Sequence, residues 1–266
     1  MLWDWQSWWA QRLEWHPSID LDVQERADAW YAAAHDRHLT VDFAHPEADL
    51  GGYPLVVVPA LYAMTDTAAT NLRRYVEDGG VLVVSCFSGI VDQNDTIHAG
   101  PHPGALRDVL GLVVEEFTPL RAGERIGLGD GLSGDVWSEV VALRGASPVW
   151  SYVDGPVAGG PAVTRNPLGH GTAWYVSTRL DADGLDAVLR RVASDALLPT
   201  RDLPRDVEVV ERLGAEGRYL FAINHSGEDT SIPVSEGVVE LLTGESPTGS
   251  VRVLAGEVRV VVERLP

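Results

Sequence analysis

The sequence predicts an α/β domain with an open, doubly wound parallel sheet, followed by a small antiparallel β-sandwich domain. Two apolar runs, YPLVVVPA at residues 53–60 and VLVVSC at residues 81–86, have the composition of parallel strands buried on both faces. A helical pattern over residues 66–78 lies between them, and a helix at 104–111 and a strand at 112–117 follow. This β-α-β-α-β order favours one parallel sheet whose strands are joined by right-handed crossovers. After about residue 205 the apolar residues alternate in period two between closely spaced turn signals, which is typical of a small sandwich.

Two helices are expected before the first strand. In the opening stretch MLWDWQSWWAQRLEW, Trp5, Trp8 and Trp9 have the i, i+3, i+4 spacing that gathers side chains on one helix face. That face either packs on its own domain or serves a partner outside this chain, because large apolar patches seldom stay exposed to water. A second helix is expected over about residues 22–37.

The remaining elements are predicted from the periodicity of apolar residues and from the capping and glycine residues between them. Thr65 is a plausible N-cap for the helix over 66–78, and Gly79-Gly80 ends it. Further elements are expected as follows: a strand at 40–44, a helix at 104–111, a strand at 112–117, antiparallel edge strands between about 120 and 180, and a helix at about 183–197. The expected organisation is a helical connection at 1–37, the main domain at 38–198, a linker at 199–204 and the C-terminal β domain at 205–266.

Charge and composition exclude several classes of partner. The net charge of −19 comes from 39 acidic against 20 basic residues, and every base is arginine. Such a surface repels nucleic acid and anionic membranes, so neither is expected as a partner. A single cysteine cannot form an internal disulfide, no secretory signal pattern opens the chain, and no run of roughly 18 apolar residues occurs. The expectation is a soluble, cytoplasmic protein.

Cys86 raises the question of nucleophilic catalysis, because a buried strand that ends in a cysteine and a sharp turn is one way to present a nucleophile. A strained nucleophile turn favours small neighbours, whereas Val84, Phe87 and Ser88 surround this cysteine. The candidate base His170 lies in a hairpin-type turn, with no His-x-Glu pair to orient its ring. We therefore interpret Cys86 as a residue that ends a strand, with a catalytic thiol as the alternative.

The histidines suggest two metal sites, and neither is complete. His98 and His102 are four residues apart, but the glycine and prolines around them prevent the helix that would align them. His35 and His38 could share a helix face next to Asp36. No third ligand accompanies either pair, and the chain has no Gly-x-Gly-x-x-Gly and no phosphate-binding loop. We predict no metal site and no cofactor.

The loop SGIVDQND places Asp92 and Asp95 at the carboxyl end of a predicted parallel strand, where ligands often bind. Two acids three residues apart more often cap and shape a turn. The two carboxyl groups of a glycosidase face each other across a substrate at about 5–9 Å, which one short loop is poorly suited to build. The residues by themselves predict no catalytic site.

Several segments resemble the C-terminal part of glycoside hydrolase family 42 β-galactosidases. LWDWQSWWA followed by HPS resembles the connection that leaves the family's catalytic barrel. The segments that resemble the trimerisation domain are YPLVVVPALY, YVEDGGVLVVSCFSGIVDQND, PGALRDVLGLVVEEFTPL and PAVTRNPLGHGTAWYVSTRLD. RYLFAINHSGEDTSIPV and ELLTGE resemble the small C-terminal β domain. Together these segments cover nearly the whole chain in the family's order.

The resemblance implies a flavodoxin-like main domain, similar to class I glutamine amidotransferases but without their catalytic machinery. Cys86 then stands where an amidotransferase carries its nucleophile, and it is not expected to react. The family's two catalytic glutamates belong to an N-terminal (β/α)8 barrel, which alone takes about 250 residues. No family catalytic position can be carried onto this chain, which is expected to be inactive alone.

The resemblance therefore implies a non-catalytic assembly part of a retaining β-galactosidase, whose barrel would hydrolyse terminal β-D-galactosides. The expected partners are further copies in a homotrimer and a catalytic barrel, which could be a separate chain. The residues expected at the interface or at the mouth of the active site are Trp5, Trp8, Trp9, Phe87, Asp92 and Asn94. The alternatives are a small-molecule hydrolase or amidotransferase-like enzyme that uses Cys86, and a carbohydrate-binding module that uses exposed tryptophans.

Overall fold

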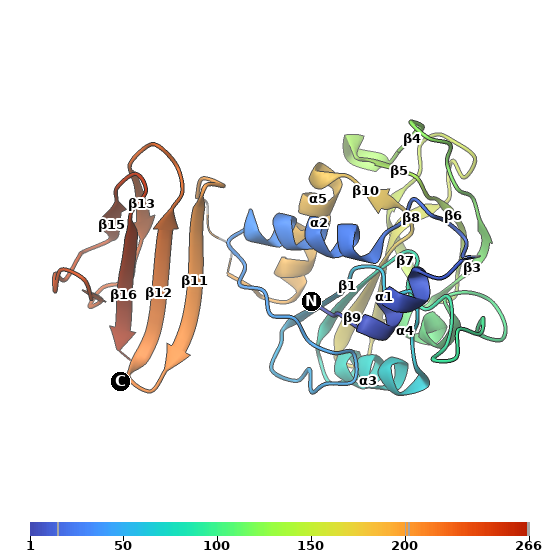
Figure 1. The fold of residues 1–266 in the computed structure, drawn as a ribbon, viewed down its shortest axis with the longest axis horizontal. Coiled ribbons are helices and arrows are strands. Elements are labelled where there is room, and N and C mark those ends of the chain that lie inside the picture. The colour runs from blue at the N-terminus through green and yellow to red at the C-terminus, as the bar shows by residue number, and fades with distance from the viewer. Residues whose placement is uncertain (15, 200, 202, 265–266) are drawn as a thin grey trace. The chain divides into compact units, whose positions relative to one another are not determined.

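The computed structural model describes residues 1–14, 16–199, 201 and 203–264, which form two compact units (Figure 1). The α/β unit contains Met1–Tyr31 and Asp42–Leu198, and the β unit contains Ala32–Val41 and Pro199–Pro266. Residues 32–41 thus group with the C-terminal part of the chain. The predicted linker at 199–204 includes residues 200 and 202, which lie outside the described residues, as do the last two residues of the predicted C-terminal domain.

The main sheet of the α/β unit is mixed. Its strands, in spatial order, are β1 (Leu55–Val58), β2 (Val81–Ser85), β9 (Gly171–Val176), β8 (Pro161–Leu168) and β7 (Ser147–Ser151). The first three are parallel, and β8 and β7 run antiparallel to their neighbours. The two predicted buried strands are confirmed, as is the addition of antiparallel strands at one edge.

Helices cover both faces of this sheet. They are α1 (Trp5–Gln11), α2 (Val23–His35), α3 (Asp66–Glu77), α4 (Arg107–Leu110) and α5 (Ala182–Asp195). Leu82 and Tyr175 point to the face covered by α3 and α4, with which they share a buried core. Trp174 precedes Tyr175 in β9 and therefore points to the other face, where its Nε1 donates to Asp195 Oδ2 of α5 (3.1 Å). In Figure 1, α2 and α5 lie above the sheet and α3 lies below it.

The strand at 112–117 does not join the main sheet, so that part of the prediction is wrong. This strand, β3 (Leu112–Phe117), pairs antiparallel with β6 (Glu139–Leu143). The place beside β2 is taken by β9, whose side chains are almost all buried. Gly111, at φ +63°, ends the single turn of α4, and its carbonyl accepts from Arg144 N and Ala146 N, which brings the end of β6 back to β3. The apolar run indicates that residues 112–117 form a strand, whereas the hydrogen bonds to Gly111 O determine that this strand pairs with β6.

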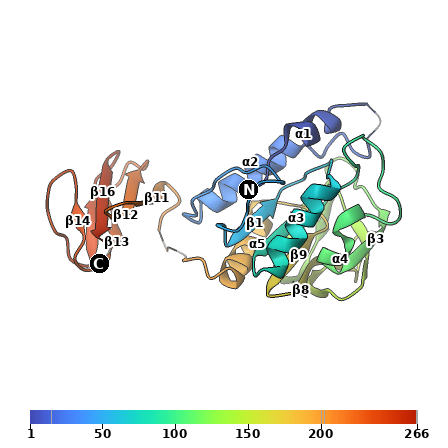
Figure 2. The same cartoon turned by 90° about the horizontal axis from the view of Figure 1, so that it is seen from below.

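The other small elements of this unit lie around the main sheet. They are η1 (Gly104–Leu106), η2 (Gly129–Gly131), β4 (Arg125–Gly127), β5 (Ser133–Asp135) and β10 (Arg179–Leu180), the three strands forming an antiparallel sheet. The strand predicted at 40–44 is reduced to one bridge between Leu2 and Ala44. Leu2 N donates to Val57 O, so the start of the chain covers the free edge of β1. Figure 2 shows α1 and α2 following one another along one side of the unit.

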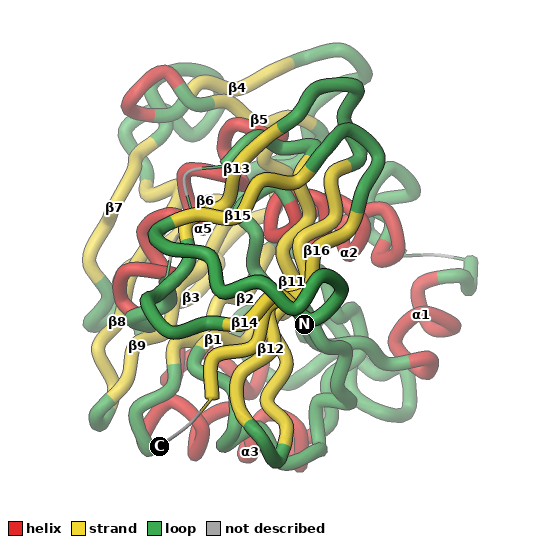
Figure 3. Tube along the Cα trace, turned by 90° about the vertical axis from the view of Figure 1, so that its left-hand side faces the viewer, coloured by secondary structure: helices red, strands yellow, loops and turns green. Residues whose placement is uncertain are grey.

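The β unit confirms the predicted antiparallel architecture at the C-terminus. One sheet contains β11 (Val207–Gly214), β12 (Gly217–Asn224), β16 (Val258–Arg264) and β14 (Val239–Glu240), and a second pairs β13 (Thr230–Pro233) with β15 (Ser250–Val253) (Figure 3). Alternate residues of both sheets, such as Ala222 and Val253, form one buried core. Among all the described residues, no helix is long and apolar enough to cross a lipid bilayer.

Candidate functional site

The predicted interface residues gather at the carboxyl edge of the main sheet, where β1 and β2 end. α1 is fixed at this edge because Ser7 Oγ accepts from Ala63 N, just beyond β1 (3.1 Å). Asp4 caps the helix by accepting from Gln6 N (2.9 Å). Local capping and one contact with the sheet therefore position the tryptophans of α1.

Four rings form the base of this edge, and we call Tyr62, Phe87, Phe117 and Trp137 the aromatic cluster. Ring centroids are 5.4 Å apart for Tyr62 and Phe87, 5.4 Å for Phe87 and Trp137, and 5.0 Å for Phe117 and Trp137. These separations fall in the range that favours aromatic pairing. Trp8 of α1 packs against the buried core that contains Tyr62, Phe87 and Trp137. Helix α1 therefore packs on a buried core that contains most of the aromatic cluster.

The tryptophans of α1 differ in burial. Trp8 is half-buried, lies 5.0 Å from the Arg12 guanidinium, and has a buried Nε1 without a hydrogen-bond partner in the structure. Trp5 and Trp9 are 58% and 60% exposed. Trp5 meets the edges of Trp3 and Trp8, at centroid distances of 5.3 and 5.8 Å. One turn of helix therefore presents two large rings to the surface.

Phe87 lies beneath this surface rather than on it. Its side chain is 0% exposed, and its backbone φ is +66°, a region that residues other than glycine seldom adopt. The strained position after β2 is therefore occupied by a phenylalanine, one residue beyond Cys86. Burial of the ring in the aromatic cluster offsets the cost of this backbone conformation.

The loop after β2 is shaped by Asp92. Its Oδ1 accepts from Asn94 N (2.8 Å) and Thr96 N (3.0 Å). The hydrogen bond from the Thr96 backbone, followed by that from Asn94, holds the pKa of Asp92 below its usual value. Asn94 is exposed, and Ile97 in the same loop is 76% exposed. The carboxylate of Asp92 organises a turn that displays its neighbours.

Cys86 lacks the environment of a nucleophile. The thiol is 2% exposed, and burial, followed by the negative charge of Glu139, raises its pKa well above the ordinary value. His170 lies at the opposite edge of the sheet, because Thr172 pairs with Val81 at the start of β2. Several residues of strand rise put roughly 20 Å between the two side chains. The structure therefore favours the interpretation of Cys86 as a strand-end residue.

His98 and His102 make separate contacts. A ring nitrogen of His98 lies 3.1 Å from Met64 O, while His102 packs edge-on against Phe117 at 5.2 Å. Burial, followed by the charge of His98, lowers the pKa of His102 to about 3. The two histidines therefore make separate packing and hydrogen-bonding contacts within one loop, and they do not converge on a common ligand position.

The second histidine pair lies within the β unit. His35 is 3.9 Å from both Asp36 and Glu208, and a ring nitrogen of His38 lies 3.2 Å from Leu203 O. In the part of the chain that the structure describes, no group of three or more His, Cys, Asp or Glu side chains could hold a metal ion.

Glu139 is a residue that the sequence analysis missed. It is 0% exposed, and its two carboxyl oxygens accept from Trp137 Nε1 (2.9 Å) and Tyr175 OH (2.7 Å). Burial raises its pKa to about 8, against the effect of these two hydrogen bonds. The signal was present in the alternation of WSEVVAL, where Glu139 falls on the same side as Trp137 and Val141.

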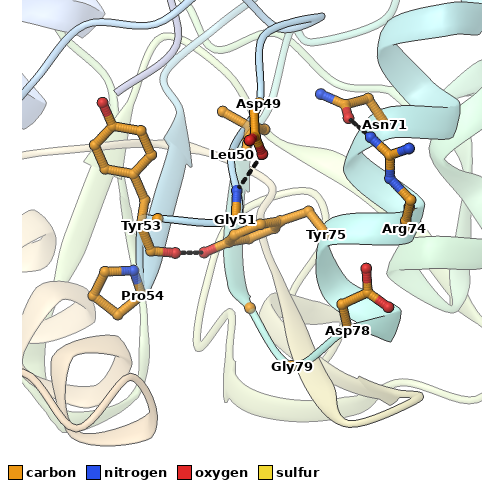
Figure 4. Close-up of a pocket in the computed structure, with 12 residues that line it drawn as sticks. Asp49, Leu50, Gly51, Tyr53, Pro54, Asn71, Arg74, Tyr75, Asp78 and Gly79 are labelled. Carbon is orange, nitrogen blue, oxygen red and sulfur yellow. Dashed lines mark hydrogen bonds between the residues drawn. The ribbon is translucent and has the colours of Figure 1, made fainter.

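A pocket of about 670 Å³ opens at the amino edge of the same sheet (Figure 4). Arg74 donates to Asn71 Oδ1 (2.8 Å), and Tyr75 OH donates to Tyr53 O (2.9 Å). Asp49 also lines the pocket, and its Oδ1 accepts from Gly51 N (3.0 Å). None of the predicted interface residues lines this pocket.

The comparisons with known proteins agree over both units. A family model described as the β-galactosidase trimerisation domain matches residues 1–199, and one described as the β-galactosidase C-terminal domain matches residues 206–263. A β-galactosidase of Arthrobacter sp. is 39% identical over 265 residues, which are 99% of this chain and 38% of the relative. β-Galactosidase LacZ of Heyndrickxia coagulans is 35% identical over 266 residues, or 98% of this chain and 40% of the relative.

Solved structures show the same relationship. The β-galactosidase of Bacillus circulans sp. alkalophilus superposes with a TM-score of 0.93 at 30% identity, over 99% of this chain and 41% of its own. The β-galactosidase of Rahnella sp. R3 gives a TM-score of 0.89 at 26% identity, over 99% of this chain and 40% of its own.

The fold and these matches define the chain as part of a glycoside hydrolase. The chain belongs to the glycoside hydrolase family 42 β-galactosidases, of which it is the trimerisation domain and the C-terminal domain. It spans about two-fifths of the length of the curated relatives that it matches.

Proposed function

We propose that the chain holds the subunits of a β-galactosidase together as a homotrimer. Hydrolysis of terminal β-D-galactosides would be the task of a (β/α)8 barrel that is not among these residues. The observation that carries the proposal is the match of residues 1–199 to a trimerisation domain. The burial of Cys86 and its distance from His170 support an accessory rather than a catalytic role.

The proposed contact surface is the carboxyl edge, with Trp5, Trp9 and Asn94 exposed on it. Trp8 and Phe87 would support this surface from below, and tryptophans on a rigid base are typical anchors of interfaces. Each such ring can bury about 150–250 Å² in a contact.

The proposal includes a structural relationship with class I glutamine amidotransferases through a flavodoxin-like α/β unit. The parallel core of β1, β2 and β9, with helices on both faces, supports it. A nucleophile turn places the reacting residue at the strained backbone position. Phe87 occupies that position here, so the turn would have kept its shape without a nucleophile.

Light scattering behind a sizing column tests the proposal. A homotrimer has three times the 28.8 kDa mass of one chain. The double substitution Trp5→Ala and Trp9→Ala should shift the protein to monomer, whereas Phe43→Ala, which removes an equally exposed ring elsewhere, should leave the trimer intact. A monomeric parent chain would contradict the assembly role. A double variant that stays trimeric would place the contact on another surface.

A carbohydrate-binding role is the second candidate, and the exposure of Trp5 and Trp9 favours it. Sugar rings stack on exposed indoles, so galactose or lactose should change the tryptophan fluorescence in a saturable way. The Trp5→Ala and Trp9→Ala variant should lose that response. A flat titration of the parent chain would remove this candidate.

A further inference from the structure

Glu139 ties together two parts of the α/β unit that the sequence separates. Through Oε1 it holds the indole of Trp137, a member of the aromatic cluster. Through Oε2 it holds the hydroxyl of Tyr175, which lies in the core beneath α3. Trp137 and Tyr175 are each 1% exposed, so water does not reach this junction.

Arg26 and Arg179, whose charges act on nearby Cys86, are paired with other acids rather than with Glu139. Arg26 of α2 is paired with Glu25 in the same helix. Arg179 of β10 is paired with Asp135, with Nε to Oδ1 at 2.6 Å and a second contact at 3.0 Å. Both guanidinium groups are therefore neutralised by other acids. A carboxylate at position 139 would be buried with two neutral donors, and no cation among the described residues is paired with it.

The other titratable groups that face Glu139 are neutral hydroxyls and a thiol. They are Cys86 at the end of β2, Tyr152 after β7 and Tyr175 in β9. Burial raises the pKa of each one well above its ordinary value. Glu139 is therefore the first group of this junction to lose a proton as the pH rises.

We infer that Glu139 is a proton-operated clamp: as a neutral acid it accepts from Trp137 through Oε1 and donates its own proton to the Tyr175 hydroxyl through Oε2, and on ionisation it loosens the aromatic cluster beneath α1. The physical reason is the large cost of burying a carboxylate without a paired cation. Since Trp8 packs against the buried core that contains Trp137, the order of the tryptophan surface would depend on the proton at Glu139.

The sign of the effect follows from linkage. In the unfolded chain a glutamate has a pKa of about 4.3, whereas burial raises the folded pKa of Glu139 to about 8. The stability contributed by the neutral acid is fully present below the unfolded value. It is lost progressively as the pH rises to the folded value, and it stays constant above that.

The test is Glu139→Gln in the full chain, because glutamine keeps an acceptor for Trp137 and cannot ionise. We expect the melting temperature of the variant minus that of the parent to rise between about pH 5 and pH 8 and then to level off. The slope of this rise against pH should correspond to one proton per chain. Glu116→Gln is the matched control, since Glu116 is exposed in the neighbouring strand β3 and should give no such rise. A Glu139→Gln curve parallel to the parent would overturn the proposal.

A second measurement needs no variant. Infrared spectra of the parent chain should show the carbonyl band of a protonated carboxyl group at pH 7, and this band should vanish towards pH 9. Near-ultraviolet circular dichroism should change over the same range as Trp137 loses its fixed surroundings. Absence of the band at pH 7 would overturn the proposal even if Glu139→Gln failed to fold.

Discussion

At the carboxyl edge of the main sheet large side chains fill the space, whereas at the amino edge backbone approaches backbone. Phe87 and Trp137 pack ring against ring at the first edge. At the second, a Cβ on Gly171 would lie 2.2 Å from Gly80 O and 2.3 Å from Val76 O. At the first edge, substitution of a side chain can therefore change the surface without moving the backbone. At the second, no side chain fits between Gly171 and the segment 76–80, although the pocket opens beside this contact.

The largest effect on stability is expected where a substitution disrupts the aromatic cluster. Phe87→Ala should lower the free energy of unfolding by about 3–5 kcal/mol, because it empties a fully buried site. Trp9→Ala, which removes a ring from the surface of the same edge, should change the free energy of unfolding of the dissociated chain by about 0.5 kcal/mol or less. Urea unfolding of the two variants measures the difference. Equal losses of stability in the two variants would contradict the distinction between the buried aromatic cluster and the exposed tryptophans.

At the amino edge, Gly171→Ala should destabilise the protein by about 3 kcal/mol, because the added methyl group meets fixed carbonyl oxygens. Gly52→Ala is the matched control, since no atom lies within 4 Å of the added Cβ there. The midpoint of thermal unfolding compares the two variants. A tolerated alanine at 171 would contradict the close backbone contact described between Gly171 and the segment 76–80.

A smaller effect is expected at the start of α3, which begins at the carboxyl edge. Thr65 Oγ1 accepts from Ala68 N (2.9 Å), so Thr65→Ala should cost about 1 kcal/mol. Thr70→Ala, at an exposed position inside the same helix, should stay within about 0.5 kcal/mol of the parent. Chemical denaturation of both variants separates capping from a general effect of losing a threonine.

Sequence reasoning succeeded where neighbours along the chain decide the outcome. Thr65 caps α3 as expected, and Gly79 follows its end with φ +116°. The strands β1 and β2 were visible as apolar runs, because both of their faces are buried. The antiparallel strands of the β unit were visible in their period of two.

The misses share one cause, which is dependence on distant contacts. The apolar run of β3 was recognised, but its partner β6 was not, since a strand pattern does not name its neighbour. The helical spacing of Trp5, Trp8 and Trp9 was correct, yet it could not show that Trp8 meets the cluster while the others stay exposed. Glu139 was overlooked because its partner Tyr175 lies 36 residues away.

The sequence by itself determined the α/β class of the first unit, the antiparallel second unit, the caps of α3 and the resemblance to the family. These features depend on residue types and on spacings of a few positions. Only the tertiary structure decided the order of the strands, the burial of Phe87, the separation of Cys86 from His170 and the uncharged surroundings of Glu139. Each of these depends on which distant segments meet, and the free energy of burial that selects such meetings is a property of the whole packed core.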